Sequence, residues 1–309
     1  MYRDFEIIQP YLLVLFLATS IILSCLDFTR NITGVFFEVN GSETNNLLVG
    51  QNGEGLKNST IHDLQDKIYQ TMLLADTFET RIDKITHLLE TTSGYPAIRN
   101  ISYTNQISTE FMGIPESSDI DKRTTAKYLL KNETILGGVY FTLPNGDVYL
   151  GEPYSAQKQL PRFNFADRDW YKGVSKTNET YISSVFLSAS TRAPATAIAV
   201  PVYQDDNKIN LVGYWVGIVN IGPLWKNIKD HFLTAGQDLV VVDHNGTEMF
   251  NSGKYNYTKI KSASLLNESG NATVIDSNNT TIRILEGDIV AISYPIQMRS
   301  HVWIVTILQ

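Results

Sequence analysis

A long amphipathic helix is the feature that most limits how this chain can fold. Apolar residues recur at spacings of three and four, the period of one helix face, at Ile61, Leu64, Ile68, Met72, Ala75, Phe78, Ile82, Ile85 and Leu88. Thr60 is a suitable N-cap, and Gly94 followed by Pro96 ends the pattern. A helix of about 30 residues within 61–93 would be roughly 45 Å long, more than one globular domain needs. We expect a stalk that also packs along a domain; an ordinary amphipathic core helix is the alternative.

The chain after this helix is rich in predicted strands. Residues 135–151 predict a hairpin, with the turn at residues 144–147. Strand-like segments follow at residues 181–188, 195–202 and 211–219. A helix that ends at Lys176 is predicted before these strands, with Asp167 as its expected N-cap. A helix that begins at Pro223 is predicted after them and completes this unit, which covers residues 94–235.

A second, smaller β unit is predicted at residues 236–309. It begins with a strand, an Asn-Gly turn at Asn245 and another strand, and residues 282–285, 288–295 and 301–308 supply more strands. The first unit also starts with a hairpin that turns at an Asn-Gly pair. This weak internal repeat indicates two related modules behind one helix, and hence an α+β fold.

An apolar run occupies residues 11–26. It is short for a spanning helix and long for the core of a signal peptide. We favour an uncleaved signal anchor within residues 1–30, joined by a polar connection at residues 31–60. A buried soluble helix and lipid attachment at Cys25 are the alternatives.

Asparagine glycosylation sequons are unusually frequent, since they begin at twelve of the 23 asparagines. Serine and threonine frequency alone would give roughly four. They begin at Asn31, Asn40, Asn58, Asn100, Asn132, Asn178, Asn245, Asn256, Asn267, Asn271, Asn278 and Asn279. None precedes the apolar run, so the pattern predicts a chain exposed outside the cell with glycans on surface loops. An archaeal cell surface would fit a sequon-rich chain that has one cysteine and hence no internal disulfide.

Composition argues against several classes of function. The net charge of −7, without a basic run, disfavours a nucleic-acid partner. None of the five histidines is spaced as a metal ligand, so we expect no zinc site and no cofactor. No Gly-x-Ser-x-Gly elbow supports a surface hydrolase.

Residues 163–171 combine a cation, two carboxylates and four aromatic rings. A fixed guanidinium offers a planar fork for a carboxylate, and neighbouring rings supply apolar walls. The alternative is a surface cluster in which Arg168 pairs with Asp167 or Asp169, while the rings face the core.

These features together resemble the double Cache extracytoplasmic sensor domains of prokaryotic chemoreceptors and sensor kinases. The resemblance covers roughly residues 59–308, and its most telling local part is residues 165–173, followed by the strand segments near residues 181 and 198. It implies a long N-terminal helix followed by two PAS-like antiparallel-sheet modules. The membrane-distal module, at residues 94–235, would hold the ligand pocket.

The resemblance also implies which residues contact the ligand. One branch of the family binds amino acids through a set of Tyr, Arg, Trp, Tyr and Asp. Arg168 and Trp170 match the residues that hold the carboxylate, and Tyr171 matches one that shapes the pocket. The first Tyr position falls on Phe163 and the Asp position on Ile218, and the predicted ligand-binding set also includes Phe186 and Ser188.

The missing Asp leaves a buried ammonium without a counter-charge, which would be costly. An organic acid is therefore as good a candidate as an amino acid. We expect a non-enzymatic sensor, attached to the cell membrane by its N-terminal helix and facing outside. It would bind a small carboxylate and could dimerise through the long helix. A structural or adhesive surface glycoprotein is the main alternative.

Overall fold

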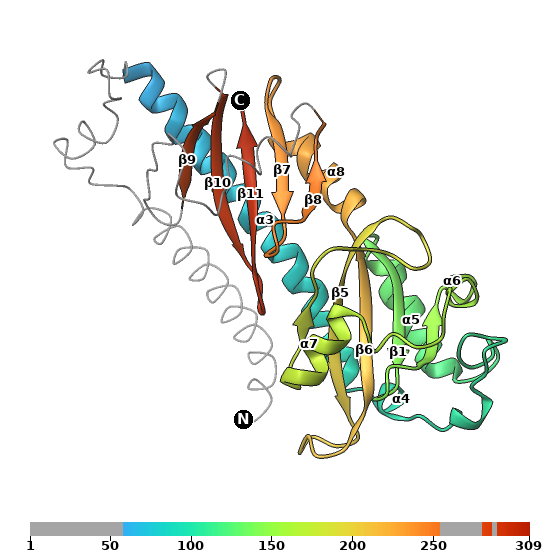
Figure 1. The fold of residues 1–309 in the computed structure, drawn as a ribbon. Helices are drawn as coiled ribbons and strands as arrows, with labels where there is room; N and C mark the ends of the chain where they lie inside the picture. Colours follow the sequence, from blue (N-terminus) through green and yellow to red (C-terminus); the bar gives the residue numbers. More distant parts are fainter. Residues whose placement is uncertain (1–57, 254–279, 286–288) are drawn as a thin grey trace, which may run out of the picture. The chain divides into compact units, whose positions relative to one another are not determined.

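The computed structural model describes residues 58–253, 280–285 and 289–309 (Figure 1). The predicted membrane anchor at residues 1–30 lies outside these ranges, as do residues 31–57 of the polar connection and seven of the twelve sequons. Among the described residues, no helix is both long enough and apolar enough to cross a bilayer.

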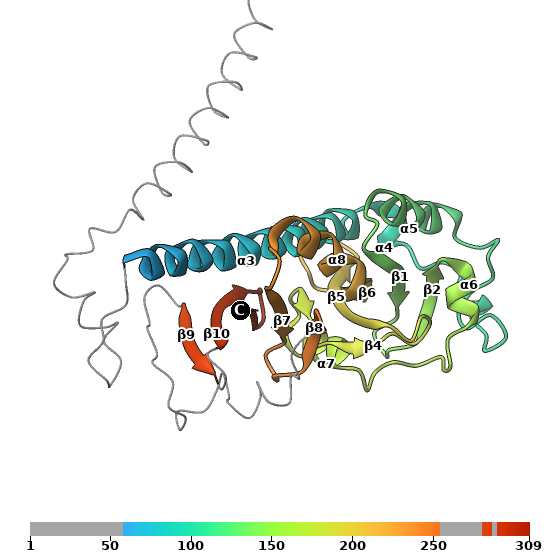
Figure 2. The ribbon, with the colours of Figure 1, turned by 90° about the horizontal axis from the view of Figure 1, so that it is seen from above.

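The predicted long helix is present as α3 (Asn58–Ser93), whose 36 residues span about 54 Å. Residues 58–60 are already helical, so Thr60 lies inside α3 and is not its N-cap. Figure 2 shows α3 running past both sheets, and it packs against strands of each. It is thus a core helix as well as a connector. Its buried residues are Thr71, Leu74, Ala75, Phe78, Ile82, Ile85, Thr86, Leu89 and Thr92, whereas Met72 and Leu88 are only partly buried.

The first sheet has the strand order β2-β1-β6-β5-β3, and β4 also pairs with β5. Its strands are β1 (Leu136–Thr142), β2 (Val148–Glu152), β3 (Tyr181–Ile182), β4 (Phe186–Leu187), β5 (Pro194–Tyr203) and β6 (Leu211–Asn220). The predicted strand at residues 181–188 is broken into β3 and β4. The break occurs because the amides of Ser184 and Val185 donate to the carboxylates of Asp169 and Asp243 and not to β5.

Short helices connect and flank these strands. They are α4 (Pro96–Arg99), the 3-10 turn η1 (Thr104–Gln106), α5 (Ile120–Asn132), α6 (Tyr154–Lys158), α7 (Asp169–Thr177) and α8 (Ile221–Phe232). Helix α5 packs against β1 and β2, and α7 packs against β3 and β5. Helix α8 follows β6 directly and packs against α3. The sequence predicts a helix that begins at Pro223, and α8 begins two residues earlier, at Ile221.

The second sheet repeats the topology of the first. Its order is β8-β7-β11-β10-β9, formed by β7 (Asp238–Val242), β8 (Glu248–Asn251), β9 (Thr281–Leu285), β10 (Ile289–Gln297) and β11 (Val302–Leu308). In both sheets the first hairpin lies beside the last strand, which pairs in turn with the strand before it. The weak repeat in the sequence therefore corresponds to a repeated fold, and the α+β class is confirmed.

The two faces of the first sheet are buried against different partners. Phe141, Ile198 and Trp215 belong to the core shared with α3. Their strand neighbours Tyr140 and Ala199 belong to a separate cluster on the opposite face, which includes Trp170. Because side chains alternate along each strand, one face of this sheet packs against the main core and the other against a second layer, which contains a cavity.

Candidate functional site

A cavity of about 50 Å³ lies on the face of the first sheet that is turned away from α3. Strands β1, β2 and β6 form its floor, and residues around the start of α7 and between β4 and β5 form its walls. Its lining residues are Tyr140, Thr142, Val148, Phe165, Arg168, Trp170, Phe186, Ser188, Ala189, Ser190, Val216 and Ile218. On this face β5 contributes only the small side chains of Ala197 and Ala199 to the cluster. Small side chains there leave space between the sheet and α7.

Arg168 is the one charged residue among those that line the cavity. It is the N-cap residue of α7 with an extended backbone (φ −72°, ψ 148°), and its side chain makes no capping bond. Asp167, the expected N-cap, instead forms an ion pair with Arg162, and this hydrogen bond lowers the pKa of the Asp167 carboxyl. The N-cap prediction was therefore wrong by one residue.

The guanidinium of Arg168 has no ion-pair partner among the residues that the structure describes. Asp169, on its other side, accepts hydrogen bonds from the amide (2.8 Å) and hydroxyl (3.1 Å) of Ser184. Both neighbouring carboxylates thus have other partners, and neither forms an ion pair with Arg168 in the described part of the chain. The guanidinium carbon instead lies 5.6 Å from the centre of the Phe186 ring.

Five of the seven predicted ligand-binding residues line the cavity, and two do not. Arg168, Trp170, Phe186, Ser188 and Ile218 belong to the lining. Tyr171 lies behind it, because its ring meets Trp170 and Tyr214 edge-on and its hydroxyl donates to the carbonyl of Pro144. Phe163 is also outside the lining, and its carbonyl accepts a hydrogen bond from the amide of Val148.

Sequence reasoning missed three polar residues of this cavity, Tyr140, Thr142 and Ser190. The hydroxyl oxygens of Tyr140 and Thr142 are buried and have no hydrogen-bond partner among the described residues. Burial raises the pKa of Tyr140, and nearby Ser190 offsets this only in part. The spacing of Tyr140 and Thr142 could have indicated that they belong together, because residues two apart on a strand point to the same face of the sheet. Among the described residues that line the cavity none is acidic, and Ile218 stands where the resemblance would place an Asp.

A second polar cluster lies where the first sheet meets two turns of the second. The rings of His244 and His301 are stacked with centres 3.6 Å apart. His301 Nε2 lies 2.8 Å from the hydroxyl of Tyr181, and His244 Nε2 lies 3.3 Å from that of Ser184. No group of three or more potential metal ligands occurs within residues 58–253, 280–285 and 289–309. Sequence spacing alone did not suggest this histidine pair, which is 57 residues apart.

The histidine pair predicts that stability falls in mild acid. Burial, followed by the proximity of His244, lowers the pKa of His301 below its usual 6.5, although Asp169 and Asp243 oppose this shift. The unfolded chain therefore binds this proton more readily, and stability is lost as the pH falls through about 6.5. We expect the melting temperature of His301→Gln to fall less between pH 7.5 and 5.5 than that of the wild type. The matched variant His87→Asn, at an exposed position of α3, should follow the wild type, and equal slopes for all three proteins would contradict the prediction.

Solved structures with a similar fold are ligand-binding domains of receptors. The domain of the Pseudomonas fluorescens chemoreceptor CtaA in complex with L-leucine is 18% identical with a TM-score of 0.57, and the match covers 82% of this chain and 97% of that one. The domain of the Pseudomonas aeruginosa PAO1 amino acid chemoreceptor PctB in complex with L-arginine is 14% identical with a TM-score of 0.56, covering 80% and 87%.

Sequence comparison gives a more limited match. Sporulation kinase D of Bacillus subtilis (strain 168) is 30% identical over 128 residues, which are 41% of this chain and 24% of that protein. This chain thus matches about a quarter of the length of that relative. No protein-family model matches the sequence. The chain has the fold of the ligand-binding domains of amino acid chemoreceptors, which is the double Cache fold that its sequence resembles.

Proposed function

We propose that this chain is an extracytoplasmic sensor module that binds a small carboxylate in the cavity beside α7. The observation that carries the proposal is the guanidinium of Arg168, which lines a largely apolar cavity without an ion-pair partner among the described residues. A buried or half-buried cation is stabilised by a carboxylate, and the guanidinium fork can bind both oxygens. Trp170 and Phe186 would supply the walls.

A bound ligand would influence the second sheet through contacts that start at the cavity. Arg168 is followed directly by Asp169, the first residue of α7. The carboxylate of Asp169 accepts a hydrogen bond from the amide of Ser184. The hydroxyl of Ser184 in turn contacts His244 and accepts a hydrogen bond from Asn245, both in the turn between β7 and β8. Ligand binding at the start of α7 would thus favour one arrangement of these contacts over another.

In the cell, this module would be attached to the membrane and exposed to the outside. The N-terminal apolar run would anchor the chain in the cell membrane with the two modules outside, and α3 would provide the contact of a homodimer. The module would carry out no chemistry itself and would pass the signal to an output region or partner. A surface glycoprotein without a ligand remains the alternative, and the following experiment separates the two.

Arg168→Gln should weaken carboxylate binding by about 10- to 150-fold, because hydrogen bonds to a charged group contribute about 1.5–3 kcal/mol. The full chain would be screened by thermal shift against organic acids, amino acids, amines and purines, and hits would be measured by calorimetry. Arg299→Gln is the control, since it removes an exposed arginine that pairs with Glu90 and does not belong to the residues lining the cavity. If no compound raises the melting temperature of the folded wild type, or if both variants bind equally well, the sensor proposal fails and the glycoprotein alternative gains support.

A further inference from the structure

Two residues that line the cavity carry buried hydroxyls without a hydrogen-bond partner in the described part of the protein. These residues are Tyr140, which is 8% exposed, and Thr142, which is 2% exposed. Both stand on the same face of β1, and both line the cavity together with Arg168. A buried hydroxyl without a hydrogen bond is destabilising, so these groups are suited to bind something that enters the cavity.

The Tyr140 ring is held in place by close packing against glycines. A Cβ atom at Gly151 would lie too close to its Cδ1 and Cε1 atoms, and one at Gly138 would lie 2.8 Å from its Cε2 atom. The ring therefore lies where these two positions have no side chains. A side chain at either glycine would displace this ring, so the two glycines leave the room that the Tyr140 ring occupies.

The charges around the cavity limit what the hydroxyls could bind. Arg168 is the only charged lining residue, and it would hold the carboxylate in the function proposed above. An ammonium group on the same ligand would lie near a cation without an acidic partner, which is unfavourable. A neutral oxygen suits the site better, because tyrosine and threonine hydroxyls can each donate or accept a hydrogen bond.

We propose that the ligand is a short carboxylate with a neutral oxygen substituent, such as a 2-hydroxy acid, whose oxygen is bound by Tyr140 and Thr142. This inference rests on the proposed function, because it takes Arg168 as the carboxylate site. The size of the cavity supports a short ligand. Its volume of about 50 Å³ compares with roughly 10–15 Å³ for the space that one water molecule needs.

The test compares ligands that differ in one group. Lactate, alanine and propionate carry a hydroxyl, an ammonium and a hydrogen at the same carbon, and glycolate, glycine and acetate form a shorter set. Calorimetry on the full chain should show that each hydroxy acid binds at least about tenfold more tightly than its two analogues, because an analogue without the oxygen leaves buried hydroxyls unpaired.

Tyr140→Phe and Thr142→Val should each reduce this preference to below about threefold, and should leave binding of the unsubstituted acid nearly unchanged. Each variant should change the melting temperature little, because neither hydroxyl has a hydrogen-bond partner among the residues that the structure describes. Tyr149→Phe is the control on the neighbouring strand, since its hydroxyl donates to Asp119 at 2.8 Å. That variant should lower the melting temperature and keep the preference for the hydroxy acid.

Three results would overturn the inference, and they can be distinguished from failure of the proposed function. The first is equal or tighter binding of the amino acids than of the hydroxy acids. The second is a hydroxy-acid preference that survives in both variants, and the third is Arg168-dependent binding of other carboxylates when none of the six probes binds. In these cases the proposed function stands, whereas the complete absence of carboxylate binding would remove both.

Discussion

Replacing Phe78 with alanine should lower the free energy of unfolding by about 3–5 kcal/mol, which is a large part of the stability of an ordinary domain. The Phe78 ring is stacked on Trp225 at 4.5 Å and tilted against Trp303 at 5.4 Å, and all three side chains are fully buried. These residues come from α3, α8 and β11, so the substitution would open a cavity where the long helix meets both modules. Urea unfolding of the full chain is the measurement.

Leu73→Ala is the matched control for this substitution. It truncates a large apolar residue five positions earlier on the same helix, and Leu73 is 41% exposed. Its cost should stay below about 1 kcal/mol, because little buried surface is lost. If both variants cost the same, the aromatic cluster would not be a main source of stability.

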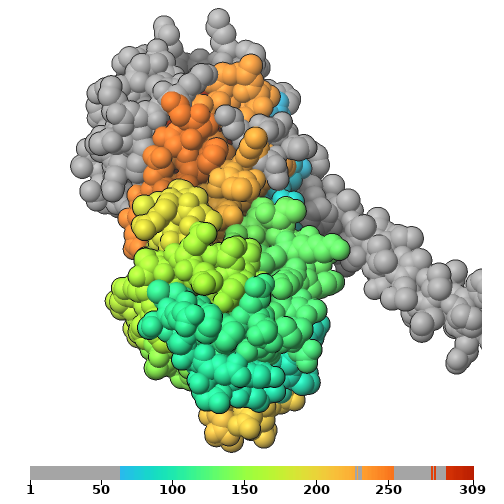
Figure 3. Space-filling view, turned by 90° about the vertical axis from the view of Figure 1, so that its right-hand side faces the viewer, coloured from blue at the N-terminus to red at the C-terminus, as the bar shows by residue number. Residues whose placement is uncertain are grey.

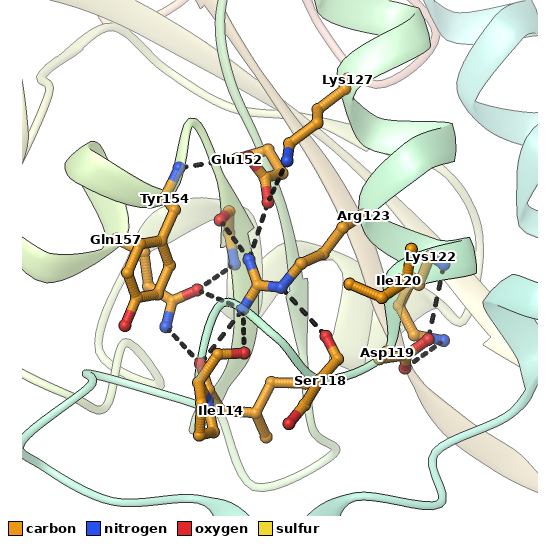
Figure 4. A network of polar contacts seen from close by, with 12 residues as sticks. Ile114, Ser118, Asp119, Ile120, Lys122, Arg123, Lys127, Glu152, Tyr154 and Gln157 are labelled. Atoms are coloured by element: carbon orange, nitrogen blue, oxygen red, sulfur yellow. Dashed lines mark hydrogen bonds and ion pairs between the residues drawn. The ribbon is translucent and has the colours of Figure 1, made fainter.

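Replacing Arg123 with methionine should also cost about 3–5 kcal/mol, because it would leave a buried carboxylate without its main partner. Figure 4 shows the guanidinium of Arg123 enclosed by polar groups from several segments. Its side chain is 1% exposed and pairs with Glu152, which is itself 1% exposed, at 2.8 Å. The other acceptors are the carbonyls of Ile114, Pro115, Ser118 and Gly151 and the side chain of Gln157.

Two further variants separate the buried ion pair from charge removal in general. Arg162→Met removes an exposed arginine whose ion pair with Asp167 should contribute only about 0–1 kcal/mol. The double variant Arg123→Met with Glu152→Gln should be more stable than Arg123→Met alone, since the buried charge is then also removed. The prediction is wrong if the Arg123 and Arg162 variants unfold at the same urea concentration.

This network also fixes elements that support the candidate site. Figure 3 shows the surface over the first module, where the segment that holds Arg123, in green, lies close to the yellow-green segments that follow β2. The network fixes the end of β2 to α5 and to residues 114–118, and β2 pairs with β1, which carries Tyr140 and Thr142. Loss of Arg123 should therefore weaken ligand binding as well as stability.

Local patterns in the chain were enough to predict most of the elements. Spacings of three and four placed the long helix, and alternation with Asn-Gly turns placed the first hairpin of each sheet. The strand expected at residues 181–188 was divided, and Asp167 was not the N-cap of α7. The strand is divided because the amides of Ser184 and Val185 donate to Asp169 in α7 and to Asp243 after β7. The N-cap differs because the Asp167 carboxylate pairs with Arg162, five residues earlier, and strand or helix propensity contains neither choice.

The candidate site was predictable only in part, for a similar reason. Residues 163–171 predict a binding site because a guanidinium and aromatic rings are adjacent in the sequence. Arg168 and Trp170 do line the cavity. Tyr140 and Thr142 come from a strand more than twenty residues earlier. Their contribution depends on which face of β1 is turned to α7, and on their hydroxyls having no hydrogen-bond partner within the described part of the chain.

The sequence by itself determined the fold class, the repeated hairpins and the arginine that stands at the start of α7, because these depend on periodicity and on neighbouring residues. Only the tertiary structure decided that Asp167 pairs with Arg162 and Asp169 with Ser184, which leaves the guanidinium of Arg168 available. The reason is that a side chain chooses its partner by distance and burial in space, and those become defined only when separate elements pack together.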